Sequence, residues 1–145
     1  MKSIAITFPN GCRVVADFAG KETELEKNLW DFLKDGRKDF VCHHTGSTGG
    51  LINSYPFPDK KFMMVAPKEP LLLCGDLAGM IGWNGFDLLL MHEELTEPLI
   101  SGAGEIAHVR EEQLAEYMEA CKDVWYHCYL YHKLAVISAE RFEEA

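Results

Sequence analysis

The chain has 145 residues, of which 48% are hydrophobic and 26% charged, as expected for one globular domain with a single core. Its net charge of −9 would repel a phosphate backbone over most of the surface, which argues against nucleic-acid binding. No apolar run approaches the ~20 residues that span a bilayer and no signal-peptide core follows Met1, so we expect a cytoplasmic protein without membrane contact.

The first 44 residues predict a β-hairpin, a helix and a third strand. Apolar residues alternate on both sides of Asn10-Gly11, a pair that supplies the positive φ angles of a tight turn. Thr23 is placed to cap a helix, because leucines recur at helical spacing after it. The expected elements are strands over residues 3–8 and 13–18, a helix over residues 23–33 and a strand over residues 38–44.

The middle of the chain predicts short strands separated by turns. Its apolar runs are bounded by Gly, Pro, Asp or Asn, which is typical of buried strands. The glycine-rich residues 75–85 are expected to join two such runs, since each glycine would cost a helix about 1 kcal/mol. Pro56 and Pro58 are expected to force a loop. The expected strands cover residues 51–55, 62–65, 71–74, 86–91 and 105–109.

The last 35 residues predict a helix, because no Gly or Pro interrupts them. A helix of that length would extend roughly 50 Å, which is too long for a domain of this size. It either breaks near residues 129–132 or packs against a second copy of the chain, and we expect a homo-oligomer through this helix. Its apolar stripe consists of Leu114, Met118, Cys121, Trp125, Cys128, His132, Ala135 and Ala139.

These elements together predict a mainly-β, α+β fold. We expect a small β-barrel over residues 1–109, with one early helix, followed by a helical extension over residues 110–145. The five cysteines are odd in number and lack CxxC spacing, so reduced thiols are expected rather than a disulfide framework or a zinc ribbon.

The first candidate site lies where the strand of residues 38–44 meets the loop TGSTGG. Neighbouring residues in a strand point to opposite faces, so only one of His43 and His44 can face the interior and act as a general base. The backbone N–H groups and hydroxyls of the loop suit a bound carboxylate or phosphate. The alternatives are a histidine that is only hydrogen-bonded in place and a flexible hairpin loop.

The second candidate site follows the strand of residues 86–91. His92, Glu93, Glu94 and Glu97 offer acid–base groups, and an HExxH metalloprotease motif is absent. A two-histidine-plus-carboxylate metal site would need the fold to unite His44, His92 and Glu94, and we expect neither a metal nor another cofactor.

We predict one shared pocket with His44, His92 and Glu94 as the catalytic residues. Trp83 is a candidate stacking surface, with a plug at one barrel end as its alternative, and Arg13 is a candidate partner for a substrate carboxylate. The predicted substrate-binding residues are His43, Thr45, Ser47, Thr48, Gly49, Trp83, Glu93 and Glu97.

The order of these elements resembles the bacterial and archaeal cyclophilin-like proteins. The matching segments are ITFPNGCRVVADF, ETELEKNLWDFL, CGDL and GEIAHV, which together span about residues 3–109. The Arg context of true prolyl isomerases is missing, so that activity is not expected. The arrangement of a barrel followed by a helical segment is similar to the cucumopine-synthase type of opine enzyme.

This resemblance implies a Pictet–Spengler-type condensation of a histidine-like amino acid with a 2-oxo acid. Ring closure of the intermediate imine needs a base that works near neutral pH, and no redox cofactor. The alternative is a non-catalytic module on the same barrel that binds a small ligand or forms oligomers.

Overall fold

The strands of this chain close into a barrel. The computed structural model describes residues 1–45, 49–57, 76–82, 85–95 and 104–144. The strands are β1 (Ser3–Thr7), β2 (Arg13–Phe18), β3 (Lys38–His44), β4 (Gly49–Phe57), β5 (Asp76–Gly82), β6 (Gly85–Leu95), β7 (Gly104–Val109) and β8 (Ala135–Phe142). They follow one another around the barrel in the order β1-β2-β7-β5-β6-β4-β3-β8, and every neighbouring pair is antiparallel.

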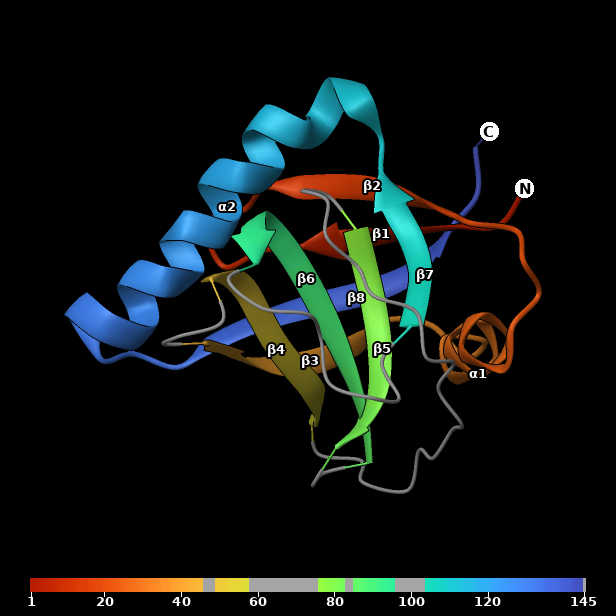
Figure 1. Ribbon diagram of the computed structural model, residues 1–145, viewed down its shortest axis with the longest axis horizontal. Helices are drawn as coiled ribbons and strands as arrows, with labels where there is room; N and C mark the ends of the chain where they lie inside the picture. Colours follow the sequence, from red (N-terminus) through yellow and green to blue (C-terminus); the bar gives the residue numbers. More distant parts are fainter. Residues whose placement is uncertain (46–48, 58–75, 83–84, 96–103, 145) are drawn as a thin grey trace.

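Two helical segments lie on opposite sides of the barrel (Figure 1). The first is α1 (Glu24–Phe32), and the second runs through η1 (Glu111–Gln113), α2 (Leu114–Tyr126) and the π-helical turn η2 (His127–Tyr131). The Thr23 hydroxyl caps α1 by accepting from the Glu26 amide at 3.2 Å, a cap worth about 1 kcal/mol. None of the helices in the described ranges combines the length and apolarity needed to cross a membrane.

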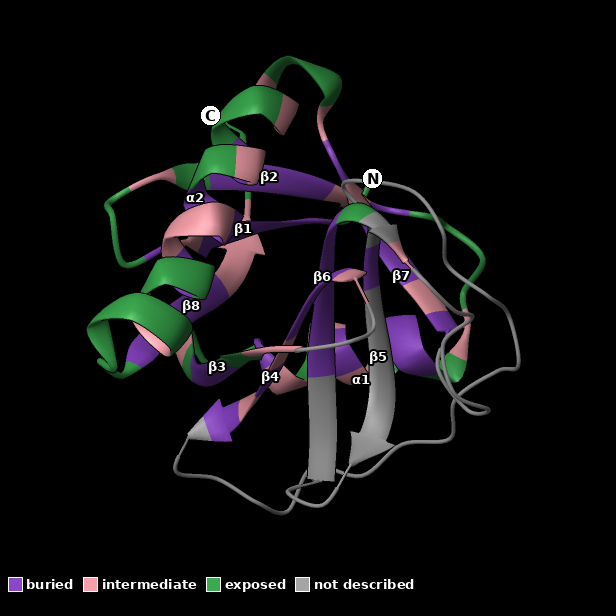
Figure 2. Cartoon of the chain, turned by 60° about the vertical axis from the view of Figure 1, so that its left-hand side comes forward, coloured by how far each residue is buried: buried purple, intermediate pink, exposed green. Residues whose placement is uncertain are grey.

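One hydrophobic core fills the barrel and joins it to both helices. Alternate residues of each strand point inward, as Phe40 and Cys42 do on β3 and Leu88 and Leu90 on β6. Figure 2 shows that the strands are buried along most of their described length, whereas α2 is exposed on its outer side. The helical residues of the core are Leu25, Leu29 and Leu33 around α1 and Tyr117, Ala120, Cys121 and Val124 on α2.

Most of the expected architecture is confirmed: the mainly-β barrel, the hairpin, the early helix, and strands close to residues 38–44, 51–55, 86–91 and 105–109. The strands expected at residues 62–65 and 71–74 lie outside the described residues. The thiols of Cys12, Cys42 and Cys128 are free.

The expectation of a helix up to the end of the chain is wrong. The helix ends at His132, which adopts a left-handed conformation with φ 53°. Residues 135–142 form β8, which lies between β1 and β3 and belongs to the barrel although it follows residue 109. Pairing on both edges outweighs the helical spacing of its alanines, because two strand partners satisfy its backbone groups.

Two local expectations in the middle of the chain also need correction. The glycine-rich stretch is not a connection, because Asp76–Gly82 is itself strand β5 and pairs with both β6 and β7. Pro56 does not break β4, because it pairs with Phe40 of β3. It lies beyond Ser54, the last β4 residue that pairs with β6 in the described register. A proline is tolerated where one side of a strand needs no amide donor.

Candidate functional site

His44 reaches the barrel interior from the last position of β3. It has the same alternation as the core residues Phe40 and Cys42, and its side chain is half-buried. His43 points the other way, is exposed, and stacks on Tyr55, whose hydroxyl lies 2.9 Å from His43 Nε2. The structure therefore answers which of the two neighbouring histidines faces inward.

His92 approaches the same point from β6. It follows the inward-facing Leu88 and Leu90 at alternate positions and is only 4% exposed. The sequence placed His92 beyond its strand, but β6 continues to Leu95, so His92 is a strand residue. The core alternation of β6 delivers its imidazole to the interior.

A bulge in β6 shapes the strand around His92. Gly49 pairs with Leu95 and Leu51 with Met91, so Gly50 alone faces the three residues between those two. A Cβ atom at Gly50 would lie 2.8 Å from the Cα of Glu93 and would also collide with its Cβ. Bulges of this kind redirect side chains and are frequent beside active sites.

The two imidazoles are in direct contact. Nε2 of His44 lies 2.8 Å from Nε2 of His92, and the ring centroids are 5.0 Å apart at an angle of 60°. Nδ1 of His44 lies 2.8 Å from the carbonyl oxygen of Thr45. Nδ1 of His92 is buried without a hydrogen-bond partner among the described residues. The carboxylate oxygen Oε1 of Glu93 lies 3.9 Å from it, which is too far for a hydrogen bond.

Burial keeps both rings neutral at pH 7. The pKa of His92 is lowered to about 4, first by burial of the ring and then by the positive charges of His44 and Lys122. Burial also lowers the pKa of His44, although its bond to the Thr45 carbonyl and the carboxylate of Glu93 act in the opposite direction. A neutral imidazole can accept a proton, so the pair is equipped for base chemistry.

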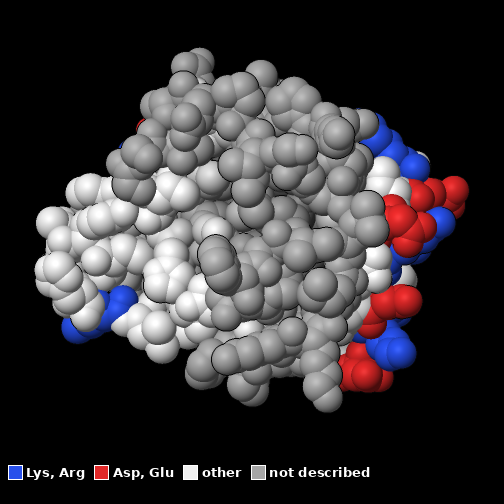
Figure 3. Space-filling model, turned by 60° about the horizontal axis from the view of Figure 1, so that its bottom comes forward, with Lys and Arg blue, Asp and Glu red and all other residues white. Residues whose placement is uncertain are grey.

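The wall beside the pair is aromatic and belongs to η2. The Tyr129 hydroxyl donates to the backbone oxygen of His44 at 2.9 Å, and the two rings meet edge-on with centroids 6.4 Å apart. Trp125 extends this wall, with its ring 5.4 Å from that of Tyr129. The end of the molecule where α2 finishes shows few charged side chains on the face seen in Figure 3.

Of the remaining residues predicted to bind substrate, only some lie in the part of the chain that the structure describes. Thr45 directs its hydroxyl to the backbone oxygens of Gly49 and Leu51, at 3.4 and 3.1 Å, and so closes the base of its loop. Gly49 adopts a φ of 95° there. Ser47, Thr48, Trp83 and Glu97 lie outside the described residues, as does the side chain of Glu94.

Arg13 is engaged elsewhere. Its guanidinium donates to Glu140 at 3.1 Å and lies over the Phe142 ring, so it is not turned toward the histidine pair. Lys122 of α2 is the cation whose charge acts on His92. Lys122, Tyr129 and Gly50 were not among the predicted site residues, although the paired glycines of TGSTGG were a signal for close backbone approach.

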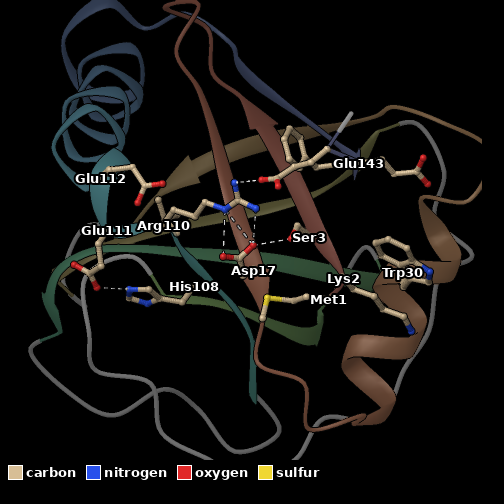
Figure 4. A pocket seen from close by; sticks show the side chains of 13 residues that line it. Met1, Lys2, Ser3, Asp17, Trp30, His108, Arg110, Glu111, Glu112 and Glu143 are labelled. Atoms are coloured by element: carbon tan, nitrogen blue, oxygen red, sulfur yellow. Dashed lines mark hydrogen bonds and ion pairs between the residues drawn. The ribbon is translucent and has the colours of Figure 1, made fainter.

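A hollow of about 990 Å³ occupies another part of the molecule (Figure 4). In it Arg110 binds Asp17 at 3.2 Å and Glu144 at 2.6 Å, and His108 lies 3.5 Å from Glu111. None of the predicted site residues lines it. Despite the size of this hollow we place the site at the histidine pair, because a buried base that lacks a partner within the described part of the chain lies there.

The described residues do not form a ready metal centre. Within those ranges, no group of three or more His, Cys, Asp or Glu side chains is arranged to hold a metal ion. The Nε2 atoms of His44 and His92 face each other at hydrogen-bond distance, so they are placed to share a proton.

Comparison with known proteins gives a likeness in fold. No protein-family model and no curated protein matches the sequence. The structure is similar to that of McbB in complex with tryptophan, with a TM-score of 0.74 and 20% sequence identity over 98% of this chain. This chain spans 45% of that one. The two proteins therefore share a fold over nearly all of this chain and under half of McbB.

Proposed function

We propose that this chain is a small-molecule enzyme that performs acid–base chemistry at His44 and His92. The observation that carries the proposal is the buried, neutral pair, in which Nδ1 of His92 has no partner among the described residues. A structural histidine normally has its buried nitrogens satisfied, because an unpaired buried acceptor costs about 1–3 kcal/mol. A site that awaits a donor from a ligand explains why this cost is retained.

The reaction we propose is a Pictet–Spengler-type condensation of an amino acid with a 2-oxo acid. Support comes from the resemblance of the chain order to the cucumopine-synthase type and from the likeness in fold to a protein solved with tryptophan bound. In this proposal His44, His92 and Glu94 are the acid–base groups of the reaction. The TGSTGG loop and Lys122 hold substrate carboxylates, and no cofactor takes part.

The direct test is to mix the protein with histidine and either 2-oxoglutarate or pyruvate and to follow the mass of the products. We expect a product equal to the sum of both reactants minus water. His92→Gln and Glu94→Gln should each slow its formation at least about tenfold, in line with the contribution of general acid–base catalysis. His108→Gln, in the distant hollow, is the matched control.

If no pair of amino acid and 2-oxo acid reacts faster than in buffer, the reaction is wrong and the ligand-binding alternative replaces it. A thermal-shift screen of the same compounds then identifies the ligand, since binding to the native state raises the apparent stability.

A homo-oligomer built on the end of the second helical segment completes the proposal. Several large apolar side chains are exposed to solvent there: Trp125 (37% exposed), Tyr126 (40%), Tyr129 (41%), Leu130 (58%), Tyr131 (52%) and Leu134 (68%). Aromatic residues are enriched at protein interfaces, and exposed apolar patches on monomers are seldom this concentrated.

A further inference from the structure

The hydrogen bonds of the histidine pair determine where its protons lie. A carbonyl oxygen can only accept, so the 2.8 Å contact with Thr45 requires a hydrogen on Nδ1 of His44. In a neutral ring Nε2 of His44 is then bare and must accept. The 2.8 Å contact between the two Nε2 atoms therefore places a hydrogen on Nε2 of His92 and leaves Nδ1 of His92 bare.

We infer that His92 and His44 form a two-histidine proton relay, with Nδ1 of His92 as the atom that exchanges protons with the substrate. This inference rests on the proposed function, and it identifies the base and the route of the proton. The entry atom is buried and lacks a partner among the described residues, so a ligand N–H or O–H is the donor that would complete it.

The relay step moves one proton and one positive charge from the substrate donor to His44. The substrate donor leaves its bonding electron pair on the substrate and passes its proton to Nδ1 of His92, which becomes an imidazolium. The proton on Nε2 of His92 then crosses the 2.8 Å bond to Nε2 of His44. His92 is neutral again, now protonated at Nδ1, and the positive charge resides on His44, whose Nδ1 still donates to Thr45.

The charges around the pair favour this direction. Lys122 on α2 repels a positive charge on His92, whereas the Thr45 carbonyl stabilises one on His44. The carboxylate of Glu93 on β6 attracts a positive charge on either ring, because it also lies 3.9 Å from Nδ1 of His92. Tyr129 on η2 fixes the backbone of His44 through its hydroxyl. Because the two rings repel each other when both are charged, the pair takes up one proton rather than two.

The reverse step returns the same proton through Nδ1 of His92. A condensation needs such a reversible store, because loss of water requires a proton donor and the later restoration of aromaticity requires a base. One pair of neutral histidines can serve both steps in sequence. His44 then acts without touching the substrate, as a positioning residue that also carries charge.

The test begins with ¹⁵N NMR of the imidazoles in the full chain at pH 7, without any substrate. We expect the unprotonated nitrogen to be Nε2 in His44 and Nδ1 in His92. The opposite tautomer in either ring would overturn the relay. This measurement does not depend on the reaction, so it stays decisive if the chain condenses nothing.

The second arm uses His44→Gln, whose amide oxygen can accept from Nε2 of His92 but cannot carry a proton onward. We expect kcat for the condensation to fall at least about tenfold with KM unchanged, and the acidic limb of the pH profile to move. An unchanged kcat would reduce His44 to a structural partner and refute the relay. His108→Gln is again the control, and full NMR agreement with no condensation would refute the proposed reaction alone.

Discussion

Replacement of Gly50 by alanine tests how closely β4 and β6 approach beside the candidate site. The added Cβ would lie 2.5 Å from the Glu93 amide nitrogen and 2.8 Å from its Cα, whereas ordinary contact begins near 3.4 Å. One strand must therefore retreat by about 1 Å, because the Cβ of Glu93 lies closer still. The opposing atoms belong to the backbone, so a rotamer change cannot absorb the strain.

The expected cost follows from these distances. Forced overpacking that moves a backbone costs about 1–3 kcal/mol, and three short contacts with Glu93 place Gly50→Ala at the upper end. Alanine also lowers the conformational entropy of the unfolded chain, which offsets about 0.4–1 kcal/mol of this cost. The net loss of unfolding free energy is therefore about 2.5 kcal/mol. With an unfolding entropy of about 2.1 cal/mol/K per residue over this chain, Tm should fall by about 8 °C.

Thermal unfolding followed by circular dichroism measures this shift. Gly20→Ala is the control, because Gly20 has a φ of 78° and open space around its Cβ position, so only backbone strain of about 1 kcal/mol applies. We expect Gly50→Ala to lose more than twice as much stability as the control. If its Tm stays within about 2 °C of the unmodified protein, β4 and β6 do not approach at Gly50 as described.

Four further measurements address the site, the core and the surface. Because the pKa of His92 is lowered to about 4, the unfolded state binds more protons, so unfolding free energy should fall as pH drops from about 6.5 to 4; His92→Gln should flatten this slope. Tyr117→Phe removes the 2.7 Å buried bond to the Met91 carbonyl and should cost about 1–3 kcal/mol in urea titrations, and a loss below 0.5 kcal/mol would contradict it. Light scattering should show an oligomer that Trp125→Glu dissociates, and a monomeric full chain at micromolar concentration refutes the interface. Chelation should leave activity intact, and loss restored by one added metal would overturn that expectation.

Local signals in the sequence predicted much of the barrel. Asn10-Gly11 located the hairpin and Thr23 located the start of α1, because turn chemistry and capping act over a few residues. The meeting of His44 and His92 was also predictable, since both follow apolar runs that alternate toward the core. The signal was that each histidine comes directly after or at the end of an apolar run, where polar residues of neighbouring strands meet at one end of a barrel.

Features set by distant partners were not predictable. Residues 135–142 carry a helical spacing of alanines, and only their pairing with β1 and β3 makes them a strand. The glycines of β5 look like a linker because their fit depends on the neighbouring strands. Gly50 is understood only through the backbone of Glu93, which lies 43 residues away in the chain.

The position of β8 has a consequence for how the chain acquires its structure. The barrel closes only when the last strand along the sequence inserts between the first strand and β3. Until then β1 and β3 each present an open row of backbone donors and acceptors, the kind of edge that recruits other chains. Closure over such long sequence separations is entropically costly and slow, so we expect insertion of β8 to limit the folding rate. A nascent chain therefore remains open to misassembly until residue 142 has left the ribosome.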